Sequence, residues 1–380
     1  MKVLLINNYS MENAYDLWAK GVSGSHHVWG KVELDRNGKV EMIIFPHERY
    51  KFLNRIGKWF GIGHLDQQLR ILFNLRKFDV LYSPYSMANT KLLLLLKWVG
   101  LFKKPIVVTI HQPFWRAKDS NKLLRFFSRQ FILQYEACIF LSESLLSKTI
   151  ETLRLPEQHQ KDRFSTTQWG PDMDFFDKYC RQAVPFDACD YFISAGHTAR
   201  DFETLIEAFR GLDYKLKIFC TPKSIPNVKD LPDNVDLNWE ATFYDLVAWY
   251  KKAIAVLIPL KYPQKNEGCQ GMTSLQDVVT FGKPVIMTKN PTLNLDVEKE
   301  GFGFYVDMYD VEGWREKVTL LHNDEELWNK MSGKSSYVFK HKFNSRIFSD
   351  HLESVLEKVY HESGAANKNR KKRERTMADL

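Results

Sequence analysis

The chain has 380 residues, of which 44% are hydrophobic and 14% aromatic, so it can form two domains with full cores and is not a largely disordered protein. Its net charge is +8, but half of this lies in the tail 365–380, so the basic balance alone does not indicate nucleic-acid binding. Five scattered cysteines form no metal-type spacing, and the longest apolar run, at 92–102, is too short to span a bilayer.

Apolar runs alternate with helical patterns in the first half of the chain. Four short runs predict buried parallel strands: 2–8, 79–83, 105–110 and 137–142. Segments with helical spacing lie between or after them: 66–75, 89–101 and a stretch that ends near Leu153. This alternation predicts a parallel sheet with helices on both faces.

The pattern breaks at 165–190, where turn-forming residues replace any period, and then restarts. The second half predicts strands at 191–196, 214–220, 255–260 and 284–288, with helices at 201–212, 245–253 and 274–281. One amphipathic helix follows at about 341–361. The predicted fold class is therefore α/β, with two Rossmann-like parallel-sheet domains in sequence.

The loops after the strands are the places to look for a site, because open parallel sheets bind ligands beyond the carboxyl ends of their strands. Two such domains predict a site in the cleft between them. After the strand 191–196, Gly196 permits a tight turn, and Arg200 stands just before a helix whose N-terminus favours an anion. Arginine gives phosphate a forked grip. The alternative is a surface arginine paired with Asp201 or Glu203.

A second helix N-terminus lies in the segment 271–282. Gly271 lets the backbone approach a ligand, and Thr273 and Ser274 are N-cap residue types whose hydroxyls also suit phosphate. Asp277 lies further along the helix and is placed to accept two hydrogen bonds from a ribose diol. The alternative is that Asp277 is an ordinary solvent-exposed helix position.

His111 ends the predicted strand 105–110 and should face the cleft. The alternative is a histidine whose hydrogen bonds are satisfied within its loop. The sequence has no DxD-type pair and no cluster at metal-ligand spacing, so we predict no metal site.

The segment GMTSLQDVVTFGKPVI at 271–286 resembles the acidic motif of the GT-B glycosyltransferases, and within them family 4, the glycogen-synthase-like retaining group. That motif holds a pair of glutamates before its Gly-Lys-Pro. In the family the second glutamate binds the nucleotide ribose, and its place falls on Asp277. The first contacts the donor sugar, and its place falls on Cys269, so Glu267 and Gln270 are the candidates to replace it.

The segment SAGHTARDFETLIEAF at 194–209 is similar to the one that opens the family's donor domain, where basic residues grip the diphosphate. The family's arginine after the glycine is His197 here, and its later lysine is Phe202, so Arg200 carries the predicted grip. The donor-binding residues that the resemblance implies are Gly196, His197, Arg200, Gly271, Met272, Thr273, Ser274 and Asp277, with Glu267 or Gln270.

The resemblance covers about residues 1–361 and implies the domain boundaries. The segment TQWGPDMDFF at 167–176 looks like the family's hinge, and TIHQP at 109–113 like its strand-end histidine. The implied parts are an acceptor-binding domain 1–170, a linker 171–190, a donor domain 191–340, a helix 341–361 that crosses back to the first domain, and a disordered basic tail 362–380.

The resemblance implies an enzyme, a hexosyltransferase that moves a sugar from a nucleotide diphosphate sugar to a hydroxyl acceptor with retention, as in polysaccharide biosynthesis. It implies no cofactor and no metal. Arg200 would stabilise the leaving diphosphate, and His111 would orient the sugar or the acceptor. The expected partners are the nucleotide-sugar donor and a saccharide or lipid-linked acceptor, with no nucleic acid.

Two segments mix basic and apolar residues as interfacial helices do: 48–64 and 121–133. The first residues form no signal-peptide core, and scattered cysteines suit a reducing compartment, so we expect a cytoplasmic protein. The two segments then predict peripheral contact with an anionic membrane surface. The alternative is that their apolar residues pack on the sheet while the basic residues face water.

Three other functions compete with this interpretation. A nucleotide-sugar epimerase needs acidic residues around the sugar ring, and the cysteine at 269 argues against it. A non-catalytic subunit of the same fold, binding a nucleotide-sugar or a partner protein, fits the departures at His197 and Phe202. A nucleic-acid binder fits worst, because the basic run is confined to the tail.

Overall fold

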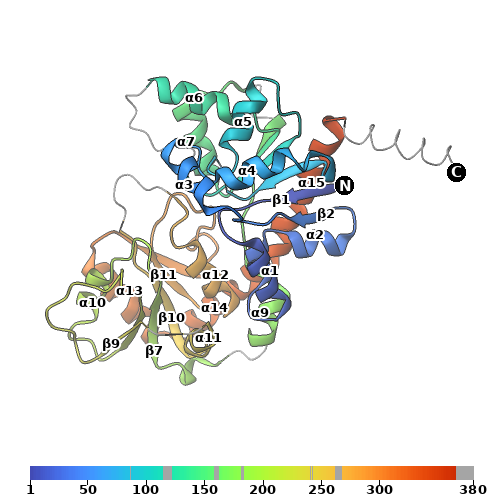
Figure 1. Cartoon of the computed structure of the whole chain (residues 1–380). Helices are drawn as coiled ribbons and strands as arrows, with labels where there is room; N and C mark the ends of the chain where they lie inside the picture. The colour runs from blue at the N-terminus through green and yellow to red at the C-terminus, as the bar shows by residue number, and fades with distance from the viewer. Residues whose placement is uncertain are drawn as a thin grey trace. The chain divides into compact units, whose positions relative to one another are not determined.

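The computed structural model describes residues 1–85, 87–113, 122–157, 162–180, 184–239, 241, 243–261 and 268–364. The chain falls into two compact units, Met1–Trp169 with Ser345–Leu380, and Gly170–Asn344. Each unit holds one six-stranded parallel sheet surrounded by helices (Figure 1). The predicted α/β fold class, with two Rossmann-like parallel-sheet domains, is confirmed.

The first sheet has the strand order β2-β1-β3-β4-β5-β6. Its strands are β1 (Lys2–Leu5), β2 (Glu41–Ile44), β3 (Val80–Ser83), β4 (Ile106–Ile110), β5 (Ala137–Phe140) and β6 (Phe164–Thr166). The helices of this unit are α1 (Met11–Ala19), η1 (Ser25–Val28), α2 (Lys31–Asn37), α3 (Lys51–Trp59), α4 (Leu65–Leu72), η2 (Leu75–Lys77), α5 (Lys91–Trp98), α6 (Lys122–Ile132), α7 (Glu143–Leu153) and α15 (Ser345–Glu362).

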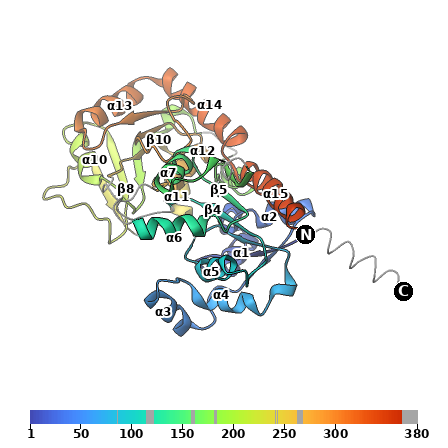
Figure 2. The same cartoon turned by 90° about the horizontal axis from the view of Figure 1, so that it is seen from above.

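Helices cover both faces of the first sheet. From β2 onward every connection moves through the sheet in the same direction, and right-handed crossovers then place α3 to α7 on one face. Contacts of α3 with α4, α4 with α5, α5 with α6 and α6 with α7 agree, and Figure 2 shows α6, α5, α4 and α3 one after another. On the other face α15 contacts α2, β3 and β5.

The second sheet has the strand order β12-β11-β10-β7-β8-β9. Its strands are β7 (Tyr191–Ala195), β8 (Lys215–Phe219), β9 (Val235–Asn238), β10 (Ala253–Ile258), β11 (Val285–Thr288) and β12 (Gly303–Val306). The helices of this unit are α9 (Met173–Cys180), η3 (Phe186–Ala188), α10 (Phe202–Phe209), α11 (Phe243–Lys251), α12 (Met272–Thr280), α13 (Val311–Asn323) and α14 (Glu325–His341).

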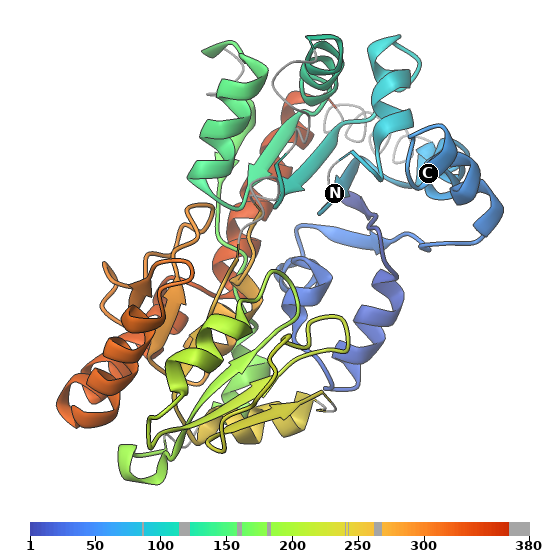
Figure 3. The same ribbon diagram turned by 90° about the vertical axis from the view of Figure 1, so that its left-hand side faces the viewer.

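The core of the second unit lies between its sheet and the helices α10, α13 and α14. Phe192 and Ile218 of the sheet pack there with Phe209, Trp314 and Trp328, all of them buried. Figure 3 shows the orange helices α13 and α14 against this sheet, and α13 contacts β10, β11 and β12. This packing holds the carboxyl edge of the sheet at a defined place, where the candidate site begins.

Four strands lacked a signal in the sequence, and all four are edge strands: β2, β6, β9 and β12. Each has at least two residues that are not fully buried, whereas β3, β4, β5, β7 and β10 are buried along their whole length. A continuous apolar run marks a strand that is covered on both faces, so a half-exposed edge strand escapes this criterion.

Two boundaries differ from the prediction. The segment expected to be a linker contains α9, which Asp172 caps by accepting hydrogen bonds from the amides of Asp174 and Phe175, and this segment belongs to the second compact unit. The final helix begins at Ser345, because α14 runs to His341 and the side chain of Asn344 donates to two of its last carbonyls. The predicted tail lies outside the described residues from 365 onward.

Candidate functional site

The second sheet reverses its strand order between β7 and β10. After β7 the chain adds β8 and β9 on one side, and it then returns to add β10, β11 and β12 on the other. Because β7 and β10 pair directly, the loops that follow them leave the same edge side by side. Open parallel sheets bind ligands at such a reversal. The structure brings the predicted donor residues together here, Gly196 to Arg200 from the loop after β7 and Gly271 to Ser274 from the connection after β10.

Arg200 is buried at this edge, with 8% of its surface exposed, so the alternative of a surface arginine is wrong. Its Nη1 atom donates to the carbonyl oxygen of Thr198 at 3.0 Å, and its Nη2 atom donates to Oγ of Ser274 at 2.7 Å. Nη2 also lies 3.5 Å from the carbonyl oxygen of Ala195, the last residue of β7. The guanidinium therefore joins the end of β7 to the first turn of α12.

The backbone of the loop after β7 is shaped to hold this arginine. Gly196 has a φ of 143°, and a Cβ atom there would lie 2.5 Å from Nη2 of Arg200. Ala199 has a φ of 52°, and its carbonyl oxygen accepts from the amide of Lys261 at 2.9 Å. Arg200 and Leu260 form an antiparallel bridge, so the two loops continue side by side beyond the edge of the sheet.

The N-terminus of α12 opens onto the same edge. Gly271 is its N-cap residue, in place of Thr273 or Ser274, with a φ of 87° and with Leu260 at 3.3 Å from where a Cβ would stand. Met272 is buried, and the hydroxyl of Ser274 is engaged by Arg200. Thr273 is exposed in the first turn, so its hydroxyl is the one that a phosphate can reach.

Asp277 lies in a recess of α12, where part of its surface faces solvent but protein atoms surround its carboxylate. The hydroxyl of Tyr250 donates to its Oδ2 atom at 3.1 Å, and the Tyr250 ring stacks on Phe281 with ring centroids 5.4 Å apart. Burial raises the pKa of Asp277 to about 7. The alternative of an ordinary exposed position is therefore wrong, and near neutral pH this carboxyl is balanced between its two protonation states.

Lys261 is a second cation at this edge, and the sequence interpretation did not assign it. Its side chain is 41% exposed, and its Nζ atom pairs with Glu203 at 3.0 Å. The family's lysine falls on Phe202, which is buried in the core, whereas Lys261 follows β10 and reaches the edge from the neighbouring strand. His197 is also exposed there. A lysine directly after a predicted strand was the available signal.

The connection before α12 contains the place of the family's first glutamate. Burial raises the pKa of the Cys269 thiol to about 12, so this residue is neutral and supplies no acid or base. Asn290, which follows β11, fixes the connection by donating to the backbone carbonyls of Gly268 and Gln270, at 3.1 and 2.8 Å. Glu267 lies outside the described residues, so its predicted role stays a prediction.

In the first unit four adjacent strands end in polar or aromatic residues. These residues form a row along the carboxyl edge: His47 after β2, Asn7 after β1, Tyr85 after β3 and His111 after β4. Nδ1 of His47 lies 3.1 Å from the carbonyl oxygen of Asn7, and the ring centroids of Tyr85 and His111 are 5.2 Å apart. We call these four residues the edge row.

His111 is neutral at physiological pH, because burial lowers its pKa to about 4 and the carbonyl of Pro84 only partly offsets this. Its Nδ1 atom is buried, and no hydrogen bond reaches that atom within the described part of the chain. The alternative of a histidine satisfied in its loop therefore does not fit. A neutral ring with an open nitrogen can accept a hydrogen bond from a substrate hydroxyl or donate one to it.

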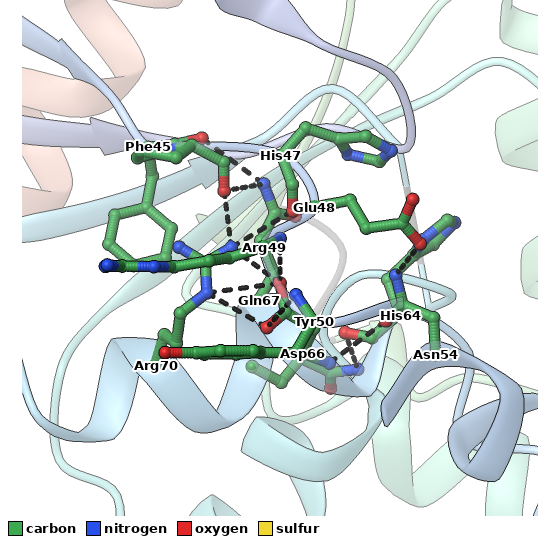
Figure 4. Close-up of polar contacts among 12 residues, drawn as sticks. Phe45, His47, Glu48, Arg49, Tyr50, Asn54, His64, Asp66, Gln67 and Arg70 are labelled. Atoms are coloured by element: carbon green, nitrogen blue, oxygen red, sulfur yellow. Dashed lines mark hydrogen bonds and ion pairs between the residues drawn. The ribbon is translucent and has the colours of Figure 1, made fainter. Parts of the chain in front are cut away.

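His47 and His64 were missed, because the strand that leads to His47 gave no signal in the sequence. Their ring centroids lie 5.4 Å apart (Figure 4). Burial, with the neighbouring His47, lowers the pKa of His64. His47 stands at the end of the edge row, so it adds a second imidazole to the side chains that can meet a ligand there.

Metal binding has no candidate in the described ranges, where no three histidine, cysteine or acidic side chains come close enough together to hold an ion. The prediction that the reaction uses no metal is not tested by this observation. No protein-family model matches the sequence, and no curated protein does.

Three solved structures resemble the chain over nearly its whole length. A glycosyltransferase from Rickettsia africae ESF-5 gives a TM-score of 0.62 at 14% identity, over 94% of this chain and 98% of that one. Sucrose-phosphate synthase (tll1590) from Thermosynechococcus elongatus gives 0.63 at 13% identity, over 95% and 100%. The Anabaena protein HepE in complex with UDP gives 0.59 at 13% identity, over 94% and 100%.

These likenesses concern the whole arrangement of both sheets rather than a shared local motif. At such low identity they establish the fold and leave the activity to be argued from the residues. Together with the two six-stranded parallel sheets they show that this chain has the GT-B fold of glycosyltransferases.

Proposed function

We propose that the protein is a glycosyltransferase that moves a sugar from a nucleotide diphosphate sugar to a hydroxyl acceptor. The observation that supports this most directly is the buried guanidinium of Arg200 at the reversal of the second sheet, tied to the first turn of α12 through Ser274. A fixed positive charge beside a helix N-terminus suits a leaving diphosphate, since neither has to reorganise as charge develops. HepE, solved with UDP and with UDP-glucose, and MnaA of S. aureus, solved with UDP, have the same fold.

The other donor contacts follow from the same edge. Asp277 would accept hydrogen bonds from the ribose, since its carboxyl lies in a recess and Tyr250 occupies only one of its oxygens. Lys261 would supply the second positive charge that the family places at the position of Phe202 here. Thr273 would donate its hydroxyl to a phosphate oxygen. Gly196 and Gly271 would let the backbone come close to the diphosphate.

The acceptor would bind to the first unit, at the edge row. His111 would orient the acceptor hydroxyl or the sugar through its open nitrogen, and His47 lies on a strand beyond β1 in the same row. The proposal further includes retention at the anomeric carbon, a hexosyl donor, no cofactor or metal, and a saccharide or lipid-linked saccharide acceptor. It also places the protein in the cytoplasm, in polysaccharide biosynthesis at the membrane surface.

A nucleotide panel tests the donor site. UDP, GDP, ADP, CMP and the common sugar conjugates are added to the protein while its unfolding temperature is recorded. A ligand at 100 times its dissociation constant adds ~2.7 kcal/mol of stability, which a domain pair of this size shows as a shift of a few degrees. A selective shift with one diphosphate supports the proposal. No shift with any member of the panel contradicts it.

A non-catalytic subunit is the second candidate, and the neutral Cys269 at the place of a sugar-binding glutamate favours it. Such a subunit would show the same thermal shift but would not break the sugar–phosphate bond. Slow release of free nucleotide from the conjugate in water, recorded by chromatography, separates the two. Release that disappears in Arg200→Ala identifies the enzyme, and binding without any release identifies the subunit.

A further inference from the structure

Helix α3 turns its apolar side toward solvent. Phe52, Ile56 and Trp59 have the spacing that lines up on one helical face, and Trp59 is 82% exposed. Phe60 directly after the helix is 62% exposed. The only buried residue of α3 is Gly57, which lies against the backbone of Gly63 and the side chain of Leu65. The alternative that the apolar residues of this segment pack on the sheet is therefore wrong for α3.

Helix α6 repeats this arrangement. Leu123 is 65% exposed, and Leu124, Phe126 and Phe127 are exposed beside it, whereas the side that packs inward consists of Ser128, Phe131 and Ile132. On the inner side Trp98 at the end of α5 contacts Phe131, with ring centroids 6.5 Å apart. Soluble proteins rarely expose large apolar side chains in groups, so two helices of this kind indicate an interaction surface.

The charges on both helices have one sign. α3 carries Lys51, Arg55 and Lys58 next to its apolar stripe, and α6 carries Lys122, Arg125 and Arg129. Neither helix contains an acidic residue. We define the docking surface as the exposed apolar residues Phe52, Ile56, Trp59, Phe60, Leu123, Leu124, Phe126 and Phe127 together with these six basic residues. Apolar and basic side chains without acidic ones match an anionic lipid headgroup layer with acyl chains beneath it.

Both helices belong to the same side of the first unit. They lie in the series of contacts that runs from α3 through α4 and α5 to α6 on one face of the sheet (Figure 2). α3 follows the loop after β2 that holds His47, and α6 follows the loop after β4 that starts with His111. Each helix therefore begins on the carboxyl edge, near an end of the edge row.

The beginning of α3 is fixed by a buried ion pair (Figure 4). The carboxylate of Asp66, which has no exposed surface, accepts hydrogen bonds from the amides of Arg49 and Tyr50 at 3.0 and 3.3 Å. Arg70 pairs with the same carboxylate at 2.7 Å and donates to the carbonyl oxygen of His47 at 3.1 Å. One network thus holds both His47 and the start of α3, so the exposed stripe is presented by a supported helix.

We propose that the docking surface binds the interface of an anionic lipid bilayer, with the apolar side chains of α3 and α6 between the headgroups. No helix in the described part of the chain combines the length and apolar character that crossing a bilayer requires, so the contact is one of lying on the surface. A second copy of the chain is a poor occupant, because two copies of this surface would bring twelve basic residues together without an acidic one. Resting on the proposed function, this contact would bring a lipid-linked hydroxyl acceptor to the edge row.

Vesicle flotation with the full chain tests the docking surface. Vesicles of phosphatidylcholine alone are compared with vesicles that also contain phosphatidylglycerol, at low and at physiological salt. The wild-type protein floats with the anionic vesicles and less at the higher salt. Trp59→Ser with Phe60→Ser, and Leu123→Ser with Phe126→Ser, each reduce the membrane partition coefficient at least about tenfold, because each pair removes two large apolar groups from the interface.

Matched variants separate the surface from general effects. Lys51→Glu with Lys58→Glu abolishes flotation, whereas Lys330→Glu with Lys334→Glu, which changes the net charge equally on exposed positions of α14, leaves it unchanged. Tyr337→Ser on α14 serves as the apolar control, since Tyr337 is also exposed. The tail contributes charge of its own, so the comparison is repeated in a full chain with Arg370→Gln, Lys371→Gln and Lys372→Gln.

Three results would overturn the proposal. Absence of flotation with anionic vesicles at low salt is the first, and equal losses in the α14 controls are the second. The third is a concentration-dependent dimer, seen by light scattering, that Trp59→Ser with Phe60→Ser dissolves, since the surface would then bind a second copy. The nucleotide thermal shift is recorded for every variant. A shift that is retained while flotation is lost shows that the docking surface and the donor site fail independently.

Discussion

Nη2 of Arg200 donates to Oγ of Ser274 at 2.7 Å, and the same hydroxyl lies 3.0 Å from the carbonyl oxygen of Ala195. These two residues are far apart in sequence, yet their contact joins the end of β7 to the first turn of α12 at the reversal of the second sheet. An arginine held in this way is preorganised, because its position is set before any anion arrives.

Replacing Arg200 should remove most of the turnover. In Arg200→Ala we expect kcat/KM for sugar transfer or donor hydrolysis to fall by about 100-fold or more, as for loss of one preorganised donor to a developing negative charge. Arg200→Lys should recover little, because one ammonium cannot contact Thr198 and Ser274 in the same geometry. Arg210→Ala is the matched control, since Arg210 is exposed and pairs with Glu207. Equal activity of Arg200→Ala and Arg210→Ala would refute the assignment.

Gly196→Ala should act on the same arginine from the other side. A Cβ atom there would lie 2.5 Å from Nη2, and the φ of 143° is unfavourable for any side chain, so we expect loss of stability together with loss of donor binding. Gly211→Ala is the control, because Gly211 also has a positive φ, of 79°, but open space around it. Denaturant unfolding and UDP titration of both variants check this. Identical effects would mean that only backbone strain matters at Gly196.

Asp277→Asn should change how stability depends on pH. The folded pKa of about 7 lies above the unfolded value of ~3.9, so the folded state binds the proton more tightly, and stability falls as pH rises from about 4 to about 7. The asparagine variant lacks this term and should be the more stable protein above pH 7, by at most ~4 kcal/mol for a shift of three pKa units. Thermal unfolding from pH 5 to pH 8.5 measures it.

The same variant should bind the nucleotide more weakly, because a neutral amide is a poorer acceptor for a ribose diol than a carboxylate. Wild-type affinity should accordingly rise as pH passes through 7, while that of Asp277→Asn stays flat. A variant that is stabilised and still binds nucleotide with wild-type affinity would show that Asp277 has no contact with the donor.

Lys261→Ala should weaken binding of the diphosphate modestly, about fivefold, because the lysine is partly exposed and screened. Glu203→Gln should act in the opposite direction, since it releases Lys261 from its ion pair for the ligand. Lys229→Ala, at an exposed position elsewhere on the unit, controls for net charge. Calorimetric titration at two salt concentrations measures all three. Weaker binding in Glu203→Gln would indicate that the pair only supports the loop.

Asp66→Asn should unfold the first unit more easily. It removes a buried charge from a pair with Arg70 and weakens two amide contacts, for which we expect ~3 kcal/mol. Burial alone would raise the pKa of Asp66, but the hydrogen bonds from Arg70, Arg49 and Tyr50 outweigh it and lower the pKa. The pair therefore stabilises the protein above pH ~4, and this contribution is lost as pH falls further. Acid unfolding that is unchanged in the variant would contradict this role.

The part of the fold that the sequence makes visible follows from burial. Strands β3, β4, β7 and β10 are covered on both faces, so they read as apolar runs, and the residues after them were correctly expected at the carboxyl edges. The edge strands β2 and β9 are half exposed and lack that signature. Because β2 was missed, so was His47, which follows it.

The sequence by itself determined the α/β class, the two sheets and the residue types in the loops after the central strands, because these depend on local periodicity and turn chemistry. Only the tertiary structure decided which groups meet. Tyr250 reaches Asp277 from another helix, and Lys261 comes beside Arg200 because β10 returns to pair with β7. The apolar stripe of α3 faces solvent for the same kind of reason: periodicity defines the two sides of a helix, and packing against its neighbours, here through Gly57, decides which side is buried.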